Sequence, residues 1–418
     1  MNVLFVHEID WLKKVVFELQ SLAELLSLRG HQVYAIDYEN SWGSNSHFSL
    51  GSLKTQEYKN VSRAFAGASV TLRRPGFIKI PGLSRLSAAF THYAEINKII
   101  QEKNIDVIVL YGVPTNGLQT VHLAKKYNIP VVFRSIDILG QLTPYSALRP
   151  ATRFFEKRVY PGVDMILALT PDLSRYVVKL GAEEAKVHVL PVLVDTDLFR
   201  PSVNPSELFQ KWGLDENDRI IVFIGTLFDF SGLDILIHRF PEILERIPRA
   251  KLLIVGDGPQ RTALESIITR LGLQKKVIIT GFQPYQTMPQ YINMAAVCIN
   301  PFLTNDITRD IFPTKIVQYL ACAKPVIATP LPGMIAITPG EEQGVLYAKN
   351  TDDISNKIIS LLQSSEHMQR LGQAGLDYVL RVHSHEKVVE QLENRLEEAI
   401  REKRSSGKIR HSVIESET

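Results

Sequence analysis

The stretch RDIFPTKIVQYLACAKPVIATP (Arg309–Pro330), with the apolar run VCINPF before it (Val297–Phe302), decides the expected fold. It predicts a buried strand, a polar loop, a short helix that begins just after Pro313, and a second strand that begins at Pro325. A helix that begins at the carboxyl end of a parallel strand directs unpaired backbone N–H groups towards that edge of the sheet. The stretch therefore predicts a parallel α/β fold with an anion site where this helix begins.

The same alternation of strand and helix occurs in both halves of the chain. Short apolar, β-branched runs are typical of strands that are buried on both faces, as in parallel sheets covered by helices. The expected strands are Val3–Val6, Val33–Ile36, Asp106–Leu110, Val131–Phe133, Met165–Leu169, Val187–Leu190, Ile220–Ile224, Lys251–Val255, Val277–Thr280, Val297–Asn300, Val326–Ala328 and Val345–Tyr347. The expected helices are Trp11–Leu28, Thr91–Lys103, Asn116–Tyr127, Leu233–Arg246, Gln260–Leu271, Asp352–Gln363 and Met368–Arg381. We therefore expect two doubly wound, Rossmann-like domains that face each other across a cleft.

The boundary between these domains is expected in a segment rich in Pro, Asn, Asp and Ser at Asp195–Asn217. A chain of 418 residues is also too long for one hydrophobic core. The expected domains are residues 1–197 and residues 198–383. A charged helix over residues 384–403 is expected to pack back on the first domain, and residues 404–418 are expected to form a disordered tail.

The overall charge excludes a function that depends on a strongly basic surface, such as nucleic-acid binding. The chain has 47 basic and 44 acidic residues, a formal net charge of +3. Residues 51–94 are locally basic and contain one acidic residue, Glu57. Their basic residues are Lys54, Lys59, Arg63, Arg73, Arg74, Lys79 and Arg85. This segment is either a solvated surface loop or a patch for an anionic partner such as a membrane lipid.

The sequence favours a cytoplasmic protein. Its two cysteines, Cys298 and Cys322, are too few for a disulfide framework. The N-terminus lacks the basic region of a signal peptide, and no run of 18 apolar residues is present. If residues 51–94 contact lipid, we expect a peripheral position at the inner face of the membrane.

Strands of the second half end in residues that suit a phosphate-bearing ligand. Gly225 lets the backbone approach a ligand closely, because no side chain intervenes. The turn Gly256–Pro259 follows the next strand, and a purely structural turn is the alternative there. Thr314 and Lys315 lie in the first turn of the helix after Pro313, where amides and an ammonium can meet a diphosphate.

Four blocks in this order resemble the donor-binding half of the retaining glycosyltransferases of the GT-B fold, known as glycosyl transferases group 1 or family 4. The blocks are IGTLFDFSGLDILI (Ile224–Ile237), LLIVGDGPQRTALE (Leu252–Glu265), VIITGFQPYQTMPQYINMAAVCINPF (Val277–Phe302) and the stretch from Arg309. RGHQVYAID (Arg29–Asp37) and VHVLPVLVDTDLFRP (Val187–Pro201) are similar to the family's second strand and interdomain linker. The resemblance covers most of the chain.

The resemblance implies transfer of a sugar, with retention of anomeric configuration, from a nucleotide-diphosphate sugar to an acceptor hydroxyl. It points to polysaccharide, lipopolysaccharide or glycolipid biosynthesis, with a glycan or lipid-linked acceptor. The nucleotide sugar is a substrate, so no cofactor is expected. We expect no metal requirement.

The resemblance also implies roles for individual residues. The residue at the Gln318 position binds the ribose hydroxyls, the one at Asp310 faces the transferred sugar, and the backbone at Phe282 reads the nucleobase. The expected donor-binding residues are Gly225, Thr226, Gly256, Gly258, Phe282, Asn300, Arg309, Pro313, Thr314, Lys315 and Gln318.

The sequence departs from the family in two places. Most members carry an Arg or Lys soon after the strand-ending glycine and a Lys before the next glycine, and both bind the diphosphate. TLFDFS at Thr226–Ser231 contains neither cation. The usual pair of glutamates is replaced by Asp310 and Gln318, and an amide has no charge. We therefore infer that Lys315, with Arg309, takes over the diphosphate clamp.

The acceptor is expected to lie against two loops of the first half. The loop HEIDWLKK (His7–Lys14) stands where the family has a glycine-rich turn, and FRSID (Phe133–Asp137) follows a later strand. The expected acceptor-side residues are His7, Glu8, Lys14 and Arg134. Asp137 is expected to orient the acceptor hydroxyl, and the expected catalytic residues are Lys315, Asp310 and Asp137. Trp11 either lines the cleft with the acceptor-side residues or packs as a helix staple, and the alternative for Arg134 and Asp137 is a satisfied loop pair.

Two other functions fit parts of this pattern. The missing cation and Gln318 would suit a catalytically weakened, sugar-nucleotide-binding relative that acts as a partner subunit. A nucleotide-sugar epimerase shares the two-domain fold but needs ionisable residues at the sugar. A nicotinamide dehydrogenase is disfavoured, because no G-x-G-x-x-G follows Val3–Val6. These motifs identify neither the sugar, nor the nucleotide, nor the acceptor.

Overall fold

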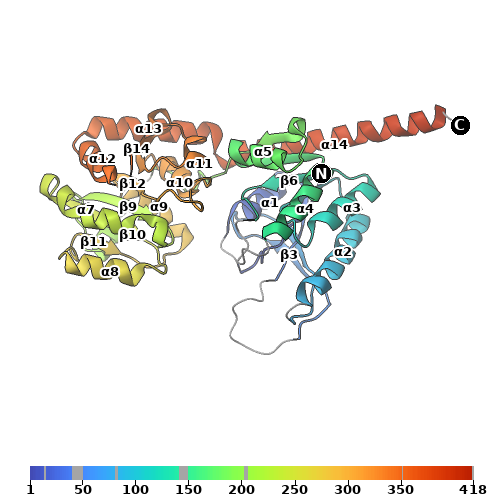
Figure 1. Cartoon of the computed structure of the whole chain (residues 1–418), viewed down its shortest axis with the longest axis horizontal. Coiled ribbons are helices and arrows are strands. Elements are labelled where there is room, and N and C mark those ends of the chain that lie inside the picture. Colours follow the sequence, from blue (N-terminus) through green and yellow to red (C-terminus); the bar gives the residue numbers. More distant parts are fainter. Residues whose placement is uncertain are drawn as a thin grey trace. The chain divides into compact units, whose positions relative to one another are not determined.

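The chain folds into two compact units, each with its own parallel sheet (Figure 1). The computed structural model describes residues 1–13, 16–39, 50–80, 83–140, 149–201, 206–350 and 352–416. Unit 1 comprises Met1–Pro191 and Val388–Thr418, and unit 2 comprises Val192–Lys387. The expected fold class, two doubly wound α/β domains, is confirmed.

Unit 1 contains an eight-stranded sheet in the order β3-β4-β2-β1-β5-β6-β7-β8. Its strands are β1 (Asn2–Val6), β2 (Gln32–Ile36), β3 (Gln56–Val61), β4 (Val70–Arg74), β5 (Val107–Leu110), β6 (Val131–Ser135), β7 (Met165–Ala168) and β8 (Val187–Val189). All pairs are parallel except that of β3 with β4. The helices are α1 (Glu18–Leu28), α2 (Ser84–Lys103), α3 (Gly117–Tyr127), α4 (Arg149–Val159) and α5 (Pro171–Lys179), and they alternate with the strands except that β2, β3 and β4 are consecutive.

Unit 2 contains a six-stranded, fully parallel sheet in the order β11-β10-β9-β12-β13-β14. Its strands are β9 (Arg219–Ile224), β10 (Ala250–Val255), β11 (Val277–Ile279), β12 (Val297–Asn300), β13 (Val326–Ala328) and β14 (Val345–Tyr347). Its helices are α6 (Ser206–Lys211), α7 (Leu233–Arg246), α8 (Arg261–Arg270), α9 (Met288–Asn293), α10 (Lys315–Ala321), α11 (Pro332–Ile335), α12 (Asp353–Leu362) and α13 (Ser365–Val382). Helix α7 contacts α8 and α12, and α10 contacts α13 (Figure 1).

Helix α1 begins at Glu18 rather than at the predicted Trp11. Asp10 accepts hydrogen bonds from the backbone N–H groups of Leu12 and Lys13, at 3.1 and 3.0 Å, and this local turn competes with helix formation. Trp11 is fully buried, and its backbone N–H donates to Asp37 at 3.0 Å. Trp11 therefore packs in the interior, and its position before the start of α1 is not that of a helix staple.

Strands β3 and β4 lie inside the basic segment 51–94 and were not predicted. β3 is polar and largely exposed, so it lacks an apolar run, and β4 ends in two arginines. Arg73 is buried against Glu95 at 2.7 Å and also pairs with Glu102 at 3.0 Å. Arg74 is buried against Asp10, at 2.7 Å, and Asp37. Segment 51–94 is therefore not a simple loop, and two of its seven cations belong to the interior.

Helix α14 (His385–Ser416) is continuous beyond Lys403, where the sequence predicted an end and a disordered tail. No proline interrupts residues 404–416, and ion pairs within unit 1 hold the helix at this point. Lys403 pairs with Asp164 at 2.7 Å, and Arg404 pairs with Asp106 at 3.1 Å. In the described part of the chain, no helix is long and apolar enough to cross a membrane.

We predict that Arg74→Ala lowers the free energy of unfolding of unit 1 by about 3–5 kcal/mol, because two buried carboxylates lose their counter-charge. Urea unfolding followed by far-ultraviolet circular dichroism measures the change. Lys59→Ala, an exposed cation of the same segment, is the control and should change the value by less than about 0.5 kcal/mol. Equal unfolding midpoints for the two variants would contradict the assignment of Arg74 to the core.

Candidate functional site

The carboxyl ends of β9, β10 and β12 meet at one edge of the unit 2 sheet. Gly225 follows β9, Gly256 follows β10, and Asn300 ends β12. A Cβ atom on Gly256 would lie 2.0 Å from the carbonyl oxygen of Gly225, and one on Gly258 would lie 2.6 Å from the backbone nitrogen of Leu227. Backbone packing alone therefore requires glycine at positions 256 and 258.

Lys315, the first residue of α10, places its amine at this edge. Its Nζ lies 3.9 Å from the ring centroid of Phe223 and 4.2 Å from that of Phe302. A Cβ atom on Gly225 would lie 3.2 Å from the same Nζ, so the glycine leaves room for the amine. Burial lowers the pKa of Lys315 well below its usual value.

No described residue forms an ion pair or hydrogen bond with the Lys315 amine. The two ring faces stabilise an ammonium through cation–π attraction, but they do not replace a hydrogen-bond acceptor. An anion that enters here would favour the protonated form of the amine and accept hydrogen bonds from its N–H groups. A phosphate oxygen is an anion of this kind.

The aromatic residues of this site were not predicted from the sequence. Phe230 packs edge-on against Phe302, with ring centroids 5.4 Å apart, and stacks with Phe228 at 5.0 Å. Phe223 and Phe302 are 6.4 Å apart. The sequence shows two phenylalanines in the TLFDFS stretch. It does not show that β9 and β12 are neighbours, which is what brings these two rings together with Phe223 and Phe302. Aromatic rings thus occupy the stretch in which the sequence lacks a cation.

The other expected donor-side residues surround the start of α10 or the ends of neighbouring strands. Thr226, Arg309 and Thr314 are exposed, whereas Pro313 is buried and Asp310 is half-buried. Arg309 lies 3.6 Å from Asp310.

Three further donor-side residues show features that a nucleotide could use. The ring of Phe282 is 77% exposed. Gln318 Nε2 donates to the hydroxyl of Tyr285 at 3.4 Å. Asn300 is fully buried, and neither polar atom of its amide has a hydrogen-bond partner among the described residues.

On the unit 1 sheet, His7 and Glu8 follow β1. His7 is fully buried, burial lowers its pKa to about 3, and its Nδ1 accepts from the backbone N–H of Ile9 at 3.2 Å. Glu8 accepts from the backbone N–H groups of Thr115 and Asn116, at 2.6 and 2.9 Å, directly before α3. A carboxylate suits the positive end of a helix, so Glu8 has a structural role there. Lys14 lies outside the described residues.

Arg134 has several hydrogen-bond partners within unit 1, whereas Asp137 has none among the described residues. Arg134 is fully buried, pairs with Glu18 at 2.6 Å, and donates to the carbonyls of Leu167 and Leu190. Asp137 is half-buried and has no hydrogen-bond partner among the described residues. Burial, and next the charge of Glu18, raise the pKa of Asp137 to about 6. The two residues do not form the loop pair considered above.

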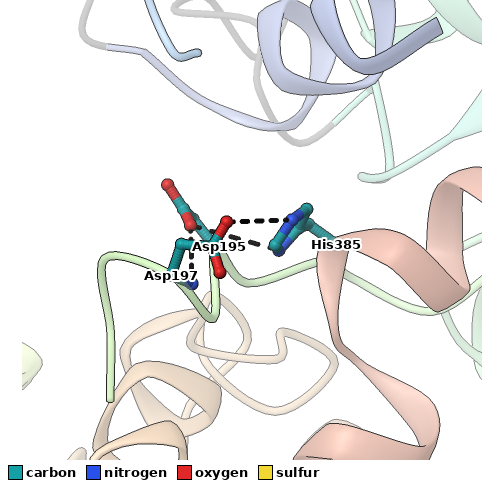
Figure 2. A group of neighbouring side chains, drawn as sticks. All are labelled: Asp195, Asp197 and His385. Carbon is teal, nitrogen blue, oxygen red and sulfur yellow. Dashed lines mark hydrogen bonds and ion pairs between the residues drawn. The ribbon is translucent and has the colours of Figure 1, made fainter. Parts of the chain in front are cut away.

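A group of three side chains in unit 2, Asp195, Asp197 and His385, is spaced closely enough to hold a metal ion (Figure 2). Their candidate ligand atoms lie within 4.8 Å of one another. His385 Nδ1 accepts from the backbone N–H of Thr196 at 3.2 Å, and Asp195 accepts from the backbone N–H groups of Asp197 and Leu198 at 3.0 Å. These hydrogen bonds account for the positions of Asp195 and His385, while Asp197 is largely exposed.

Two family models match the two units. A model described as glycosyl transferases group 1 matches residues 205–377, and one described as a glycosyl transferase 4-like domain matches residues 17–192. The chain belongs to the group 1 glycosyltransferases. The family that the sequence motifs resembled is therefore confirmed.

Two curated relatives are mannosyltransferases. The GDP-mannose-dependent alpha-(1-6)-phosphatidylinositol monomannoside mannosyltransferase of Mycolicibacterium smegmatis is 28% identical over 239 residues, which are 56% of this chain and 62% of that protein. The Mycobacterium tuberculosis H37Rv protein of the same name is 27% identical over 327 residues, 77% of this chain and 81% of that protein. The match to the M. smegmatis protein thus spans less than two thirds of its length.

Solved structures share the fold. HepE of Anabaena in complex with UDP has a TM-score of 0.69 at 17% identity, and the match covers 95% of this chain and all of that one. The sucrose-phosphate synthase of Thermosynechococcus elongatus also has a TM-score of 0.69 at 17% identity, with 94% and 97% of the two chains covered. At this identity the likeness establishes architecture, and the donor and acceptor must be argued from the site.

We predict that Asp137→Asn raises the melting temperature at about pH 7.5. The folded-state pKa of Asp137, about 6, lies above the ordinary value of 3.8, so the folded protein favours the neutral carboxyl. The contribution of Asp137 to the free energy of unfolding is therefore greatest below pH 3.8 and is lost as the pH rises through 6. The gain from the amide should therefore be smaller at about pH 5.

Differential scanning fluorimetry at the two pH values measures this difference. The control is Asp197→Asn, which alters an exposed carboxylate and should leave the melting temperature nearly unchanged at both. A lower melting temperature for Asp137→Asn at pH 7.5 would show that the ionised carboxylate stabilises the fold.

Proposed function

We propose that this protein transfers a sugar from a nucleotide-diphosphate sugar to an acceptor hydroxyl, with the donor bound by unit 2 and the acceptor by unit 1. The observation that carries the proposal is the Lys315 amine, which lies between two rings at the carboxyl edge of the sheet without an anionic partner among the described residues. A diphosphate supplies the missing charge and hydrogen-bond acceptors. Membership of the group 1 glycosyltransferases supports the same ligand class.

In the proposed reaction, the sugar–phosphate bond breaks while negative charge accumulates on the departing diphosphate. Lys315 and the backbone N–H groups at the start of α10 stabilise that charge, and Arg309 contributes from the exposed loop. Asp310 faces the sugar, and Gln318 binds the ribose hydroxyls. The acceptor attacks the face from which the diphosphate leaves, so the anomeric configuration is retained, and no metal ion takes part.

The acceptor hydroxyl is proposed to lie beside Asp137. An ionised carboxylate without internal hydrogen bonds can accept a hydrogen bond from that hydroxyl and orient it. With a pKa of about 6, the group is largely ionised at pH 7. Arg134 and Glu8 then act by positioning the surrounding loops, because their contacts are made within unit 1.

Phe282 is proposed to receive the nucleobase. Phe282 is 77% exposed and follows β11. Bases stack on aromatic faces with little selectivity, so the ring does not identify the nucleotide. The named relatives use GDP-mannose, and the HepE structure contains UDP. A thermal-shift panel of GDP-, UDP-, ADP- and dTDP-sugars would distinguish the donors.

The acceptor is proposed to be a glycan or a lipid-linked saccharide of an envelope polysaccharide, lipopolysaccharide or glycolipid. Two mycobacterial relatives are named for a phosphatidylinositol monomannoside acceptor. An acceptor of this kind would place the protein in the cytoplasm, at the inner face of a membrane.

A second candidate is a sugar-nucleotide-binding subunit without transferase activity of its own. The uncharged Gln318 and the absence of a cation in Thr226–Ser231 favour it. Release of nucleotide diphosphate by the purified chain, with a panel of acceptors, distinguishes the two. Tight donor binding without release would favour the subunit.

We predict that Lys315→Met weakens nucleotide-sugar binding at least about tenfold, because it removes the ammonium but preserves most of the side-chain volume. Isothermal titration calorimetry with the donor identified in the panel measures the change. Lys251→Met, which alters a cation of β10 that bonds to the carbonyl of Lys275, is the matched control. An unchanged dissociation constant for Lys315→Met would refute the proposed clamp.

A further inference from the structure

Unit 1 exposes a concentration of large apolar side chains around the start of α2. Of the sixteen large hydrophobic residues that are exposed in the described chain, seven lie between positions 50 and 93. They are Leu50, Leu53, Ile80, Leu83, Leu86, Phe90 and Tyr93, and we call them the α2 ridge. Phe90 is 78% exposed and Leu50 is 71% exposed. Scattered apolar residues are normal on a surface, but a cluster of this kind indicates an interaction site.

The members of the α2 ridge are contiguous. Within α2, positions 86, 90 and 93 follow helical spacing and share one face, which position 83 extends by one turn. The segment 50–53 is joined to residues 78–80 by the antiparallel bridge of Gly51 with Ile78 and by the bond from Lys79 N–H to the Leu50 carbonyl at 3.0 Å. The backbone N–H of Ile78 then donates to Ser87 of α2 at 3.0 Å.

The charges near the ridge are positive. Lys54 is exposed, and the side chains of Lys59 and Arg85 are 75% and 64% exposed. The one acidic residue of this segment, Glu57, pairs with Arg73 of the interior at 2.9 Å and lies 3.7 Å from Lys59, and Arg85 pairs with Glu8 at 3.1 Å. Lys54, Lys59 and Arg85 nevertheless form an exposed cationic rim beside the apolar side chains.

We propose that the α2 ridge docks this protein onto an anionic lipid bilayer. The apolar side chains enter the boundary between headgroups and acyl chains, and the cationic rim binds the acidic headgroups. A second copy of the chain suits the surface less well, because a two-fold interface would bring the same cations face to face. This docking depends on the α2 ridge alone and does not require that unit 2 binds a nucleotide sugar.

The test is cosedimentation of the purified full chain with vesicles of phosphatidylcholine and phosphatidylglycerol, against vesicles of pure phosphatidylcholine. The wild type should bind the anionic vesicles and bind the neutral ones at least about tenfold more weakly. Leu86→Ser/Phe90→Ser should lower binding to anionic vesicles at least about tenfold, because both side chains are exposed members of the ridge. The matched control Leu28→Ser, at a 47% exposed position of α1, should bind like the wild type.

A second variant keeps the test valid even if Leu86→Ser/Phe90→Ser does not fold. Phe90→Trp places a fluorophore on the ridge, and its emission should shift to shorter wavelength with anionic vesicles. Donor titrations with Leu86→Ser/Phe90→Ser should match those of the wild type, which separates a failure of docking from a failure of donor binding.

Absence of cosedimentation and of an emission shift would overturn the proposal. Equal vesicle binding by the wild type and Leu86→Ser/Phe90→Ser would overturn it as well. A lipid-independent dimer that this double variant dissociates would instead assign the ridge to contact between two copies.

Discussion

Strands β9, β10 and β12 pair in parallel, and this constraint fixes where chemistry can occur in unit 2. Parallel strands end at the same edge of a sheet, so the loops that follow them converge there. The loops that contain Gly225 and Gly256 lie so close together that a side chain at position 256 would clash with the backbone of Gly225. The start of α10 is delivered to the same edge by the connection between β12 and β13. This convergence brings the donor-side residues together.

The Lys315 amine is the chemical consequence of that packing. Desolvation penalises an ammonium, while the rings of Phe223 and Phe302 offset part of the penalty. Asp137 of unit 1 has the opposite charge, and like Lys315 it is a half-buried ionisable group without an ion-pair partner among the described residues. Unpaired groups of this kind cost stability and are typical of sites that bind a charged or polar ligand.

All twelve strands predicted from apolar runs are present, because strands buried on both faces must be apolar. The same rule explains why β3 and β4 were missed: Arg73 and Arg74 are buried through ion pairs with residues distant in sequence. Lys315 could be identified from its position at a helix start, but the rings beside it could not, because β9 and β12 are neighbours only in the folded sheet. Likewise, the partners of Arg134 come from α1 and from the ends of β7 and β8, which no local pattern reveals.

Hydrogen exchange measured by mass spectrometry, with and without a saturating nucleotide sugar, tests the donor site most directly. We predict that the nucleotide sugar slows amide exchange in residues 224–228, 256–260, 281–283 and 312–320 and leaves exchange in α7 and α12 unchanged. The site at Lys315 would be contradicted if the donor slowed amide exchange in other parts of unit 2 and left exchange in these four segments unchanged.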